Sequence, residues 1–202
     1  MIRILSQLSV IVFSLLEFAT SKLNEEPSPS YQLSFGSCFK YPEYGQGSTE
    51  IFHSIYQKRP NSFLWLGDFA YLDDMVLTGH VPNNITEVKK RLDESYLDPN
   101  YTLLRKSENI KILGIWDDHD YGINDGDKHN EQKEVIRQLF LDAMDEPKDS
   151  PRRTNPNGIY FSTYLHPKIK LILLDNRYEN DGYSLKDSFF EMDKERCNLG
   201  KK

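Results

Sequence analysis

The sequence alternates short apolar runs with longer amphipathic segments. The runs NSFLWLG (61–67) and NIKILGIW (109–116) are almost wholly apolar, which is typical of strands that are covered on both faces. Three further segments have the composition of strands, and the last two predict a hairpin joined by His-Pro-Lys: 31–37, 158–165 and 168–176.

Helices are expected between these runs. Residues 48–58, 84–97 and 129–145 predict helices, and 101–107 adds a helical turn. Strands that alternate with helices predict an α/β fold, in which a mostly parallel sheet has helices on its faces and one strand pair is antiparallel. The last helix has an apolar stripe, interpreted as core packing, that consists of Val135, Ile136, Leu139, Phe140 and Met144.

The first residues have the three-part shape of a secretory signal. Arg3 lies near the start, an apolar stretch follows, and the small residues Ala19 and Ser21 surround a cleavage point. Polar residues interrupt the stretch, which makes it a poor membrane span, and an uncleaved signal anchor is the alternative. We therefore expect a secreted protein with a signal peptide (1–21), a linker (22–30), one domain (31–180) and a divergent polar tail (181–202).

The composition of the chain indicates which classes of partner and which modifications to expect. Its formal net charge of −6 argues against binding to nucleic acid. In a secreted chain, the tripeptides Asn-Ile-Thr and Asn-Tyr-Thr make Asn84 and Asn100 expected glycosylation sites. The two cysteines, Cys38 and Cys197, would form a disulfide in an oxidising compartment.

Polar side chains follow four of the predicted strands at the point where each strand ends. In an open α/β sheet, ligands bind beyond these carboxyl ends. Adjacent carboxylates about 4 Å apart repel by roughly 4 kcal/mol at an effective dielectric near 20, so the acidic run either faces water entirely or is held by a cation. The convergence of four polar strand ends favours the cation. The front of the acidic run 117–127 should face that cation, and its tail should form a capping turn. The four ends are Gly36-Ser37-Cys38, Gly67-Asp68 with Tyr71 close behind, Asp117-Asp118-His119-Asp120, and Asp175-Asn176-Arg177.

Other kinds of site fit the sequence less well. An EF-hand needs acidic residues at alternate positions before its glycine, but Tyr121 precedes Gly122 and no glutamate closes the loop. The sequence has no C-x-x-C or H-x-x-x-H pair of the kind that binds zinc, and no G-x-S-x-G nucleophile elbow.

Four motifs in order resemble the metallophosphatase domain of the alkaline phosphatase D (PhoD-like) family, whose layered sheet is calcineurin-like. They are FGSC (35–38), LGDFAY (66–71), IWDDHDYGIND (115–125) and LILLDNRY (171–178), and GIYFS (158–162) fits as well. The resemblance implies a binuclear site, with iron and calcium, that hydrolyses phosphate monoesters or diesters.

The resemblance also implies roles for individual residues. Cys38 and Tyr71 would ligate iron, and Asp68 would bridge both metals. Asp118 stands where related metallophosphatases place a ligand Asn, and His119 stands where they place the histidine that assists the leaving group.

Each of these residues has a plainer alternative. Cys38 could be half of a disulfide, Tyr71 a packing aromatic, and His119 a cap of the loop. Arg177 is a candidate for binding the substrate phosphate, but an ion pair that only stabilises the structure is the other interpretation.

The sequence departs from the family after the motif at 171–178. Family members continue into a second half that supplies further metal ligands, whereas this chain ends in a polar tail, so we expect a C-terminally truncated domain that needs a partner over one flank of its core. The predicted function is a secreted metal-dependent phosphoesterase acting on a phosphate ester. The alternative is a non-catalytic secreted glycoprotein or calcium-binding fragment that keeps the fold.

Overall fold

The structure is a computed structural model that describes residues 30–40, 49–73 and 84–182. The expected signal peptide, most of the expected linker and nearly all of the expected tail lie outside these residues. From Gln32 onward the described residues belong to one compact unit. Within the described ranges, no helix is both long and apolar enough to cross a membrane.

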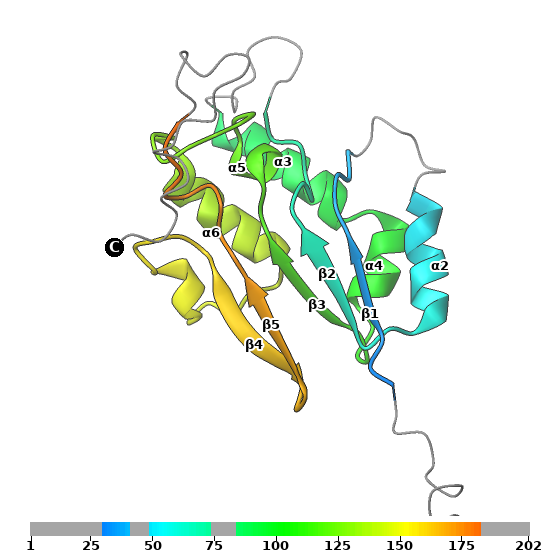
Figure 1. Ribbon diagram of the computed structural model, residues 1–202. Helices are drawn as coiled ribbons and strands as arrows, with labels where there is room; N and C mark the ends of the chain where they lie inside the picture. The colour runs from blue at the N-terminus through cyan, green and yellow to red at the C-terminus, as the bar shows by residue number, and fades with distance from the viewer. Residues whose placement is uncertain (1–29, 41–48, 74–83, 183–202) are drawn as a thin grey trace, which may run out of the picture. The chain divides into compact units, whose positions relative to one another are not determined.

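A parallel sheet is the centre of the fold. Its strands are β1 (Leu33–Gly36), β2 (Ser62–Leu66) and β3 (Lys111–Ile115), in the order β1-β2-β3. All of their arrowheads point to the same edge in Figure 1. The loops that follow the strands therefore leave the sheet side by side, as the sequence predicts.

A hairpin completes the strand inventory of the described residues. Strands β4 (Phe161–His166) and β5 (Ile169–Leu173) pair antiparallel and form a separate two-stranded sheet. Strand β5 runs in the same direction as β3 in Figure 1, so its carboxyl end points to the same edge. The predicted α/β class, with one antiparallel pair, is confirmed.

Helices connect the strands, and side-chain caps mark the start of α3 and α4. The side chain of Asn84 accepts a hydrogen bond from the backbone N–H of Thr86, and that of Asp98 accepts from Tyr101. A short helix within the acidic run was not predicted. The helices are α2 (Glu50–Lys58), α3 (Ile85–Tyr96), α4 (Pro99–Arg105), α5 (Asp118–Tyr121) and α6 (Lys133–Ala143), followed by a 3₁₀ helix, η2 (Pro151–Arg153).

One face of the sheet packs against helices through an aromatic cluster. The ring of Trp65 on β2 contacts Phe52 of α2 and Tyr101 of α4, and its Nε1–H donates to the Tyr101 hydroxyl at 3.0 Å. On β3, a Cβ added to Gly114 would lie 2.6 Å from the sulfur of Met144. The missing side chain therefore lets the end of α6 pack directly on the sheet.

The expected apolar stripe of α6 is confirmed only in part. Ile136, Phe140 and Met144 are buried and Leu139 is partly buried, but Val135 is 48% exposed. Val135 is one position away from Ile136, and a step of about 100° around the helix is enough to turn its side chain toward solvent.

The other face of the sheet carries exposed apolar side chains. Leu33, Phe35 and Leu66 are 39%, 64% and 45% exposed. Since Phe35 pairs with Leu64 and side chains alternate along a strand, all three point away from Trp65. Strand β2 is thus buried on both faces only as far as Trp65, whereas the sequence predicts complete burial.

Asp175, just after β5, joins the hairpin to the parallel sheet. Its carboxylate accepts hydrogen bonds from the indole N–H of Trp116 and from the backbone of Ile159, Arg177 and Tyr178, at 2.8–3.0 Å. Gly158 has a φ of +104°, and a Cβ there would lie 2.3 Å from Oδ2 of Asp175. Asp175 therefore has a structural role, although it follows a strand whose end was expected to contribute to the site.

Replacing Asp175 with asparagine should destabilise the fold. Asp175→Asn keeps the volume but replaces one acceptor oxygen with a donor group, which leaves one N–H unpaired and costs about 1–3 kcal/mol in the free energy of unfolding. Urea unfolding followed by tryptophan fluorescence measures this. Asp149→Asn, which removes an exposed carboxylate, is the matched control. Equal losses in the two variants would contradict the structural role of Asp175.

Candidate metal centre

Three adjoining loops bring the candidate residues together at the edge where the strands end. Gly67, Asp68 and Cys38 all have positive φ values, which turn the chain sharply after β2 and β1. A Cβ on Gly67 would lie 2.5 Å from the Cβ of Asp117, so the loops after β2 and β3 are in contact. The backbone N–H of Phe39 donates to the carbonyl of Asp68 at 2.7 Å, which attaches the loop after β1.

Asp68, Asp118 and His119 form a cluster that could hold a metal ion. Each offers one ligand atom, and these atoms lie within 4.8 Å of one another. Asp68 is 8% exposed, and its buried Oδ1 has no hydrogen-bond partner among the described residues. A buried carboxylate oxygen without a donor is costly, and a cation would satisfy it. The donor set therefore fits a metal.

Burial raises the pKa of Asp68 above its ordinary value. The nearby carboxylates of Asp118 and Asp117 raise it further, while the charge of His119 and the hydrogen bond from Cys38 lower it. A bound cation would reverse this balance, because it would favour the ionised carboxylate.

Two neighbouring side chains, Asp73 and Tyr71, contact the imidazole of His119. Its Nδ1 lies 2.9 and 3.0 Å from the two carboxylate oxygens of Asp73, whose side chain is completely buried. The ring of Tyr71 stacks on the imidazole with centroids 4.1 Å apart. Burial lowers the pKa of His119, but Asp73, Asp118 and Asp68 together outweigh burial, so that the pKa is raised.

The predicted iron ligands lie beside the cluster. The thiol of Cys38 donates to Oδ2 of Asp68 at 3.5 Å, and Cys38 is exposed. Tyr71 packs against His119, with the ammonium group of Lys40 5.6 Å from its ring centroid. Cys197 lies outside the described residues, so the alternative of a disulfide stays a prediction.

Arg177 neutralises the first carboxylate of the acidic run. Its Nε donates to Asp117 at 2.6 Å, and its Nη2 lies 3.9 Å from Asp118. Asp117 also caps α5 in a reciprocal pair with Asp120. This geometry agrees with the ion-pair interpretation of Arg177, and binding of a substrate phosphate stays a prediction.

The carboxylate of Asp120 is fully buried beneath the cluster. Burial raises the pKa of Asp120 to about 8, although the backbone N–H groups of Ala70 and Asp117, which donate to it, lower the pKa.

The tail of the acidic run forms a turn, as expected, in which the Asp127 side chain accepts from the backbone of His129.

The two sequons lie in different surroundings. Asn84 is exposed, and its side-chain oxygen caps α3. The amide nitrogen of Asn100 donates to the hydroxyl of Thr49 at 2.9 Å, and Thr49 is buried. Asn84 is therefore the more accessible position for a glycan.

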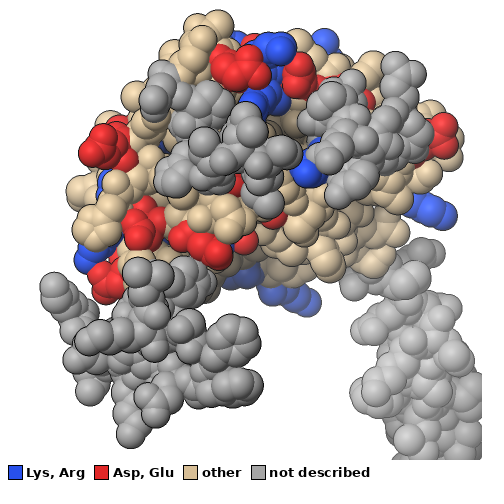
Figure 2. Space-filling view, turned by 90° about the horizontal axis from the view of Figure 1, so that it is seen from above, with Lys and Arg blue, Asp and Glu red and all other residues tan. Residues whose placement is uncertain are grey.

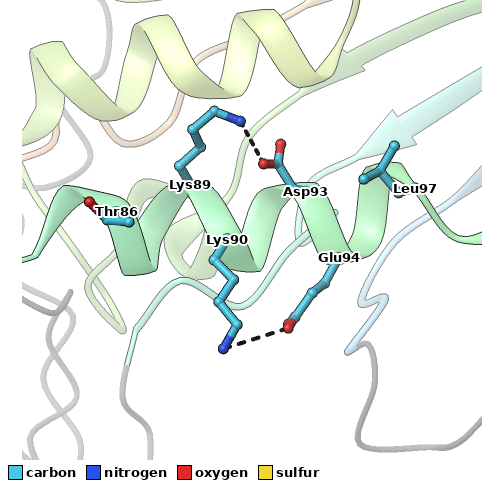
Figure 3. A pocket seen from close by; sticks show the side chains of 6 residues that line it. All are labelled: Thr86, Lys89, Lys90, Asp93, Glu94 and Leu97. Carbon is cyan, nitrogen blue, oxygen red and sulfur yellow. Dashed lines mark hydrogen bonds and ion pairs between the residues drawn. The ribbon is translucent and has the colours of Figure 1, made fainter.

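Charged side chains also cover the surface of the described residues. Figure 2 looks down on the edge where the strands end and shows Asp and Glu side chains on it, with fewer Lys and Arg side chains. Figure 3 shows a hollow along α3, where Lys89 pairs with Asp93 and Lys90 with Glu94. Such exposed pairs contribute little to stability or binding.

The fold is similar to that of one solved structure. No model of a protein family matches the sequence, and no curated protein matches it either. A solved structure, "Structure of PhoD", matches 80% of this chain with a TM-score of 0.55 and 18% sequence identity. The chain spans about a third of the length of that structure, 34%. The likeness is one of fold, and it confirms the metallophosphatase-like arrangement that the motifs predict.

Removing the buried carboxylate should weaken metal binding. We expect Asp68→Asn to reduce the affinity for Mn²⁺ or Ca²⁺ by at least about 10-fold, because the variant loses an anionic oxygen at the centre of the cluster. Isothermal titration calorimetry on metal-stripped protein measures this. Asp125→Asn is the matched control, since this exposed aspartate in the acidic run after β3 has a φ of 55° that asparagine tolerates. Equal affinities in the two variants would contradict the site.

The metal-free protein should lose stability as the pH rises from about 4 to about 8. The pKa values of Asp68, His119 and Asp120 are all raised in the fold, so the folded state binds more protons than the unfolded state in this window. Urea unfolding with a chelator at about pH 5 and about pH 8 measures the loss, and Asp120→Asn should make it smaller. A stability that increases with pH would contradict the protonated state of these carboxyl groups.

Proposed function

We propose that this chain is a metal-dependent phosphoesterase of the PhoD-like type that hydrolyses phosphate monoesters or diesters in the secretory pathway or outside the cell. The observation that carries the proposal is the buried Oδ1 of Asp68, which lacks a donor among the described residues and lies beside Asp118 and His119. A phosphatase-like fold that places these groups at the carboxyl ends of parallel strands supports the same reaction class.

Asp68 and Asp118 would hold the metal, and Cys38 and Tyr71 would extend the ligand set toward a second ion. Anionic oxygen suits calcium, whereas thiolate and phenolate favour iron, so we propose these two metals. When bound, such ions neutralise charge on phosphate oxygens and activate water. Asp117 takes no part in this, because Arg177 and the cap of α5 already occupy its oxygens.

His119 would supply the proton that the leaving group needs. Its Nδ1 faces Asp73, so Nε2 is the nitrogen that serves the substrate. The raised pKa keeps a larger share of the ring protonated near neutral pH, which suits a general acid.

A second function deserves weight because the described cluster offers three ligand residues, enough for one ion. In this alternative the chain is a secreted glycoprotein that binds calcium without catalysis.

The exposed side chains of Leu33, Phe35 and Leu66 agree with a further protein layer over the face of the sheet that points away from Trp65. We propose a partner on this face for either function.

A hydrolysis assay on metal-loaded protein separates the two functions. We expect turnover of bis(p-nitrophenyl) phosphate or p-nitrophenyl phosphate by the wild type and none by Asp68→Asn. Equal rates in the two would trace the activity to a contaminant, and bound calcium without turnover would favour the binding protein.

His119→Ala should lower turnover and leave bound metal nearly unchanged. The expected loss is about 10²–10⁴-fold, the usual contribution of a general acid. Metal content by mass spectrometry and turnover are measured on the same sample. His129→Ala, which removes an exposed imidazole, is the control. Loss of metal together with activity would make His119 a ligand and not the acid.

A further inference from the structure

We propose that a hollow beside the candidate metal centre binds the apolar group of a phosphate ester, so that the chain acts on esters of apolar alcohols. The hollow has a volume of about 270 Å³, and residues of β1, of the loop after it, of β2 and of α2 line it. The choice of a phosphate ester as the ligand rests on the proposed function, whereas the apolar site itself can be tested by binding alone.

The small residues of β1 explain why this hollow exists. Gly36 pairs with Trp65, and Ser34 pairs with Phe63. The rings of Trp65 and Phe63 face the helices, since both contact Phe52 of α2, and paired residues of neighbouring strands share a face of the sheet. Strand β1 therefore presents only a hydrogen atom and a hydroxymethyl group toward the helices, and space beside α2 stays unfilled.

The walls of the hollow are mainly apolar. Trp65 and Phe52, which are almost completely buried, contribute ring surface, and Ile51 and Ile55 of α2 contribute aliphatic side chains. Ile51 is 57% exposed and therefore borders the solvent. An apolar cavity of about 150 Å³ holds a benzene ring, so this larger hollow has room for an aryl group or a short alkyl chain. Burying such a group against these walls is favourable because it removes apolar surface from water.

The hollow adjoins the candidate metal centre through the loop after β1. Cys38 lines the hollow, and its thiol donates to Oδ2 of Asp68 at 3.5 Å. The next residue, Phe39, also lines the hollow, and its backbone N–H donates to the carbonyl of Asp68 at 2.7 Å. An ester whose phosphate lies at the cluster would therefore have the hollow directly on its β1 side.

Lys40 gives the hollow a charged end. Among the described residues that line it, Lys40 is the one with a charged side chain, and none is acidic. Its ammonium group lies 5.6 Å from the ring centroid of Tyr71, which in turn stacks on His119. The cation thus lies on the side of the cluster. This distribution of charge suits an amphiphilic ligand with its anionic head at the metal and its apolar tail in the hollow.

Binding of n-alkylphosphonates, which resemble the esters but are not hydrolysed, tests the inference. Isothermal titration calorimetry on Mn²⁺-loaded protein compares ethyl-, butyl-, hexyl- and octylphosphonate. Each added CH₂ should raise the affinity by about 2–4-fold until the hollow is full, so octylphosphonate should bind at least about 30-fold more tightly than ethylphosphonate. Equal affinities along the series, or no binding of octylphosphonate, would overturn the proposal.

Ile51→Ser locates the alkyl chain on the protein. The exposed position of Ile51 means that the variant removes apolar wall without opening the core. It should weaken binding of octylphosphonate by about 3–10-fold and leave ethylphosphonate nearly unchanged. Val135→Ser, which removes an apolar side chain of α6 that is 48% exposed, is the matched control and should change neither affinity. Equal losses in the two variants would show that the chain binds elsewhere and would overturn the site.

Lys40→Gln tests the orientation of the ligand. It should weaken binding of every phosphonate by a similar factor, about 2–5-fold, because all members of the series share the anionic head. The gain in affinity for each added CH₂ should stay the same. A loss confined to octylphosphonate would overturn the arrangement in which the head lies near Lys40 and the tail lies in the hollow.

Hydrolysis separates this inference from the proposed function. If the chain hydrolyses p-nitrophenyl phosphate but binds all phosphonates equally, the proposed function stands and the apolar site is overturned. If no ester is hydrolysed while affinity rises with chain length and falls in Ile51→Ser, the proposed function fails and the apolar site is supported. The same titration with a chelator in place of Mn²⁺ should keep the dependence on chain length, because the apolar walls do not involve the metal.

Discussion

The buried carboxylate of Asp120 is the contact on which the candidate site depends. It accepts from the backbone of Ala70 in the loop after β2 and from the backbone of Asp117 at the start of α5. One side chain thereby joins the ends of two neighbouring parallel strands. Asp68 lies two residues before one of these contacts, and Asp118 and His119 lie between Asp117 and Asp120. The positions of all three candidate ligands follow from this link.

Crowding several carboxylates at one edge would be unstable unless each had a partner. The structure provides a different partner for each one: Arg177 and the α5 cap for Asp117, backbone N–H groups for Asp120, and the backbone N–H of Asp125 for Asp118. Asp68 receives one weak donor at one oxygen and none at the other among the described residues. Oδ1 of Asp68 is therefore the carboxylate oxygen that lacks a donor, and a cation beside this atom would contribute most to the stability of the cluster.

The sequence predicted the sheet because buried parallel strands are nearly continuous apolar runs, and it predicted the edge because polar motifs follow such runs directly. It did not predict that Asp175 is structural, since an aspartate after a strand looks the same whether it binds a metal or four N–H groups. Nor did it predict Asp73. In the sequence, Asp73 is one of two adjacent aspartates, and only the path of the loop after β2 brings it against His119.

The helix α5 was missed for a related reason. Four residues are too short for a periodic pattern, and the aspartates that start the helix also suggest a solvated loop.

The three strand ends differ in how firmly they hold their residues, and this has a consequence for metal selection. Asp68 and Asp118 follow the central strand β2 and its neighbour β3, and Asp120 joins their loops to each other. Cys38 follows β1, the strand on the other side of β2, and its side chain is exposed. A backbone hydrogen bond from Phe39 and a long hydrogen bond from the Cys38 thiol, both to Asp68, tie that loop to the cluster. The firmly held oxygens would therefore set the affinity for a hard cation, while the thiol, on the less constrained side, would decide whether a softer or trivalent metal is also accepted. The acidic cluster and the thiol thus follow different strands of one sheet.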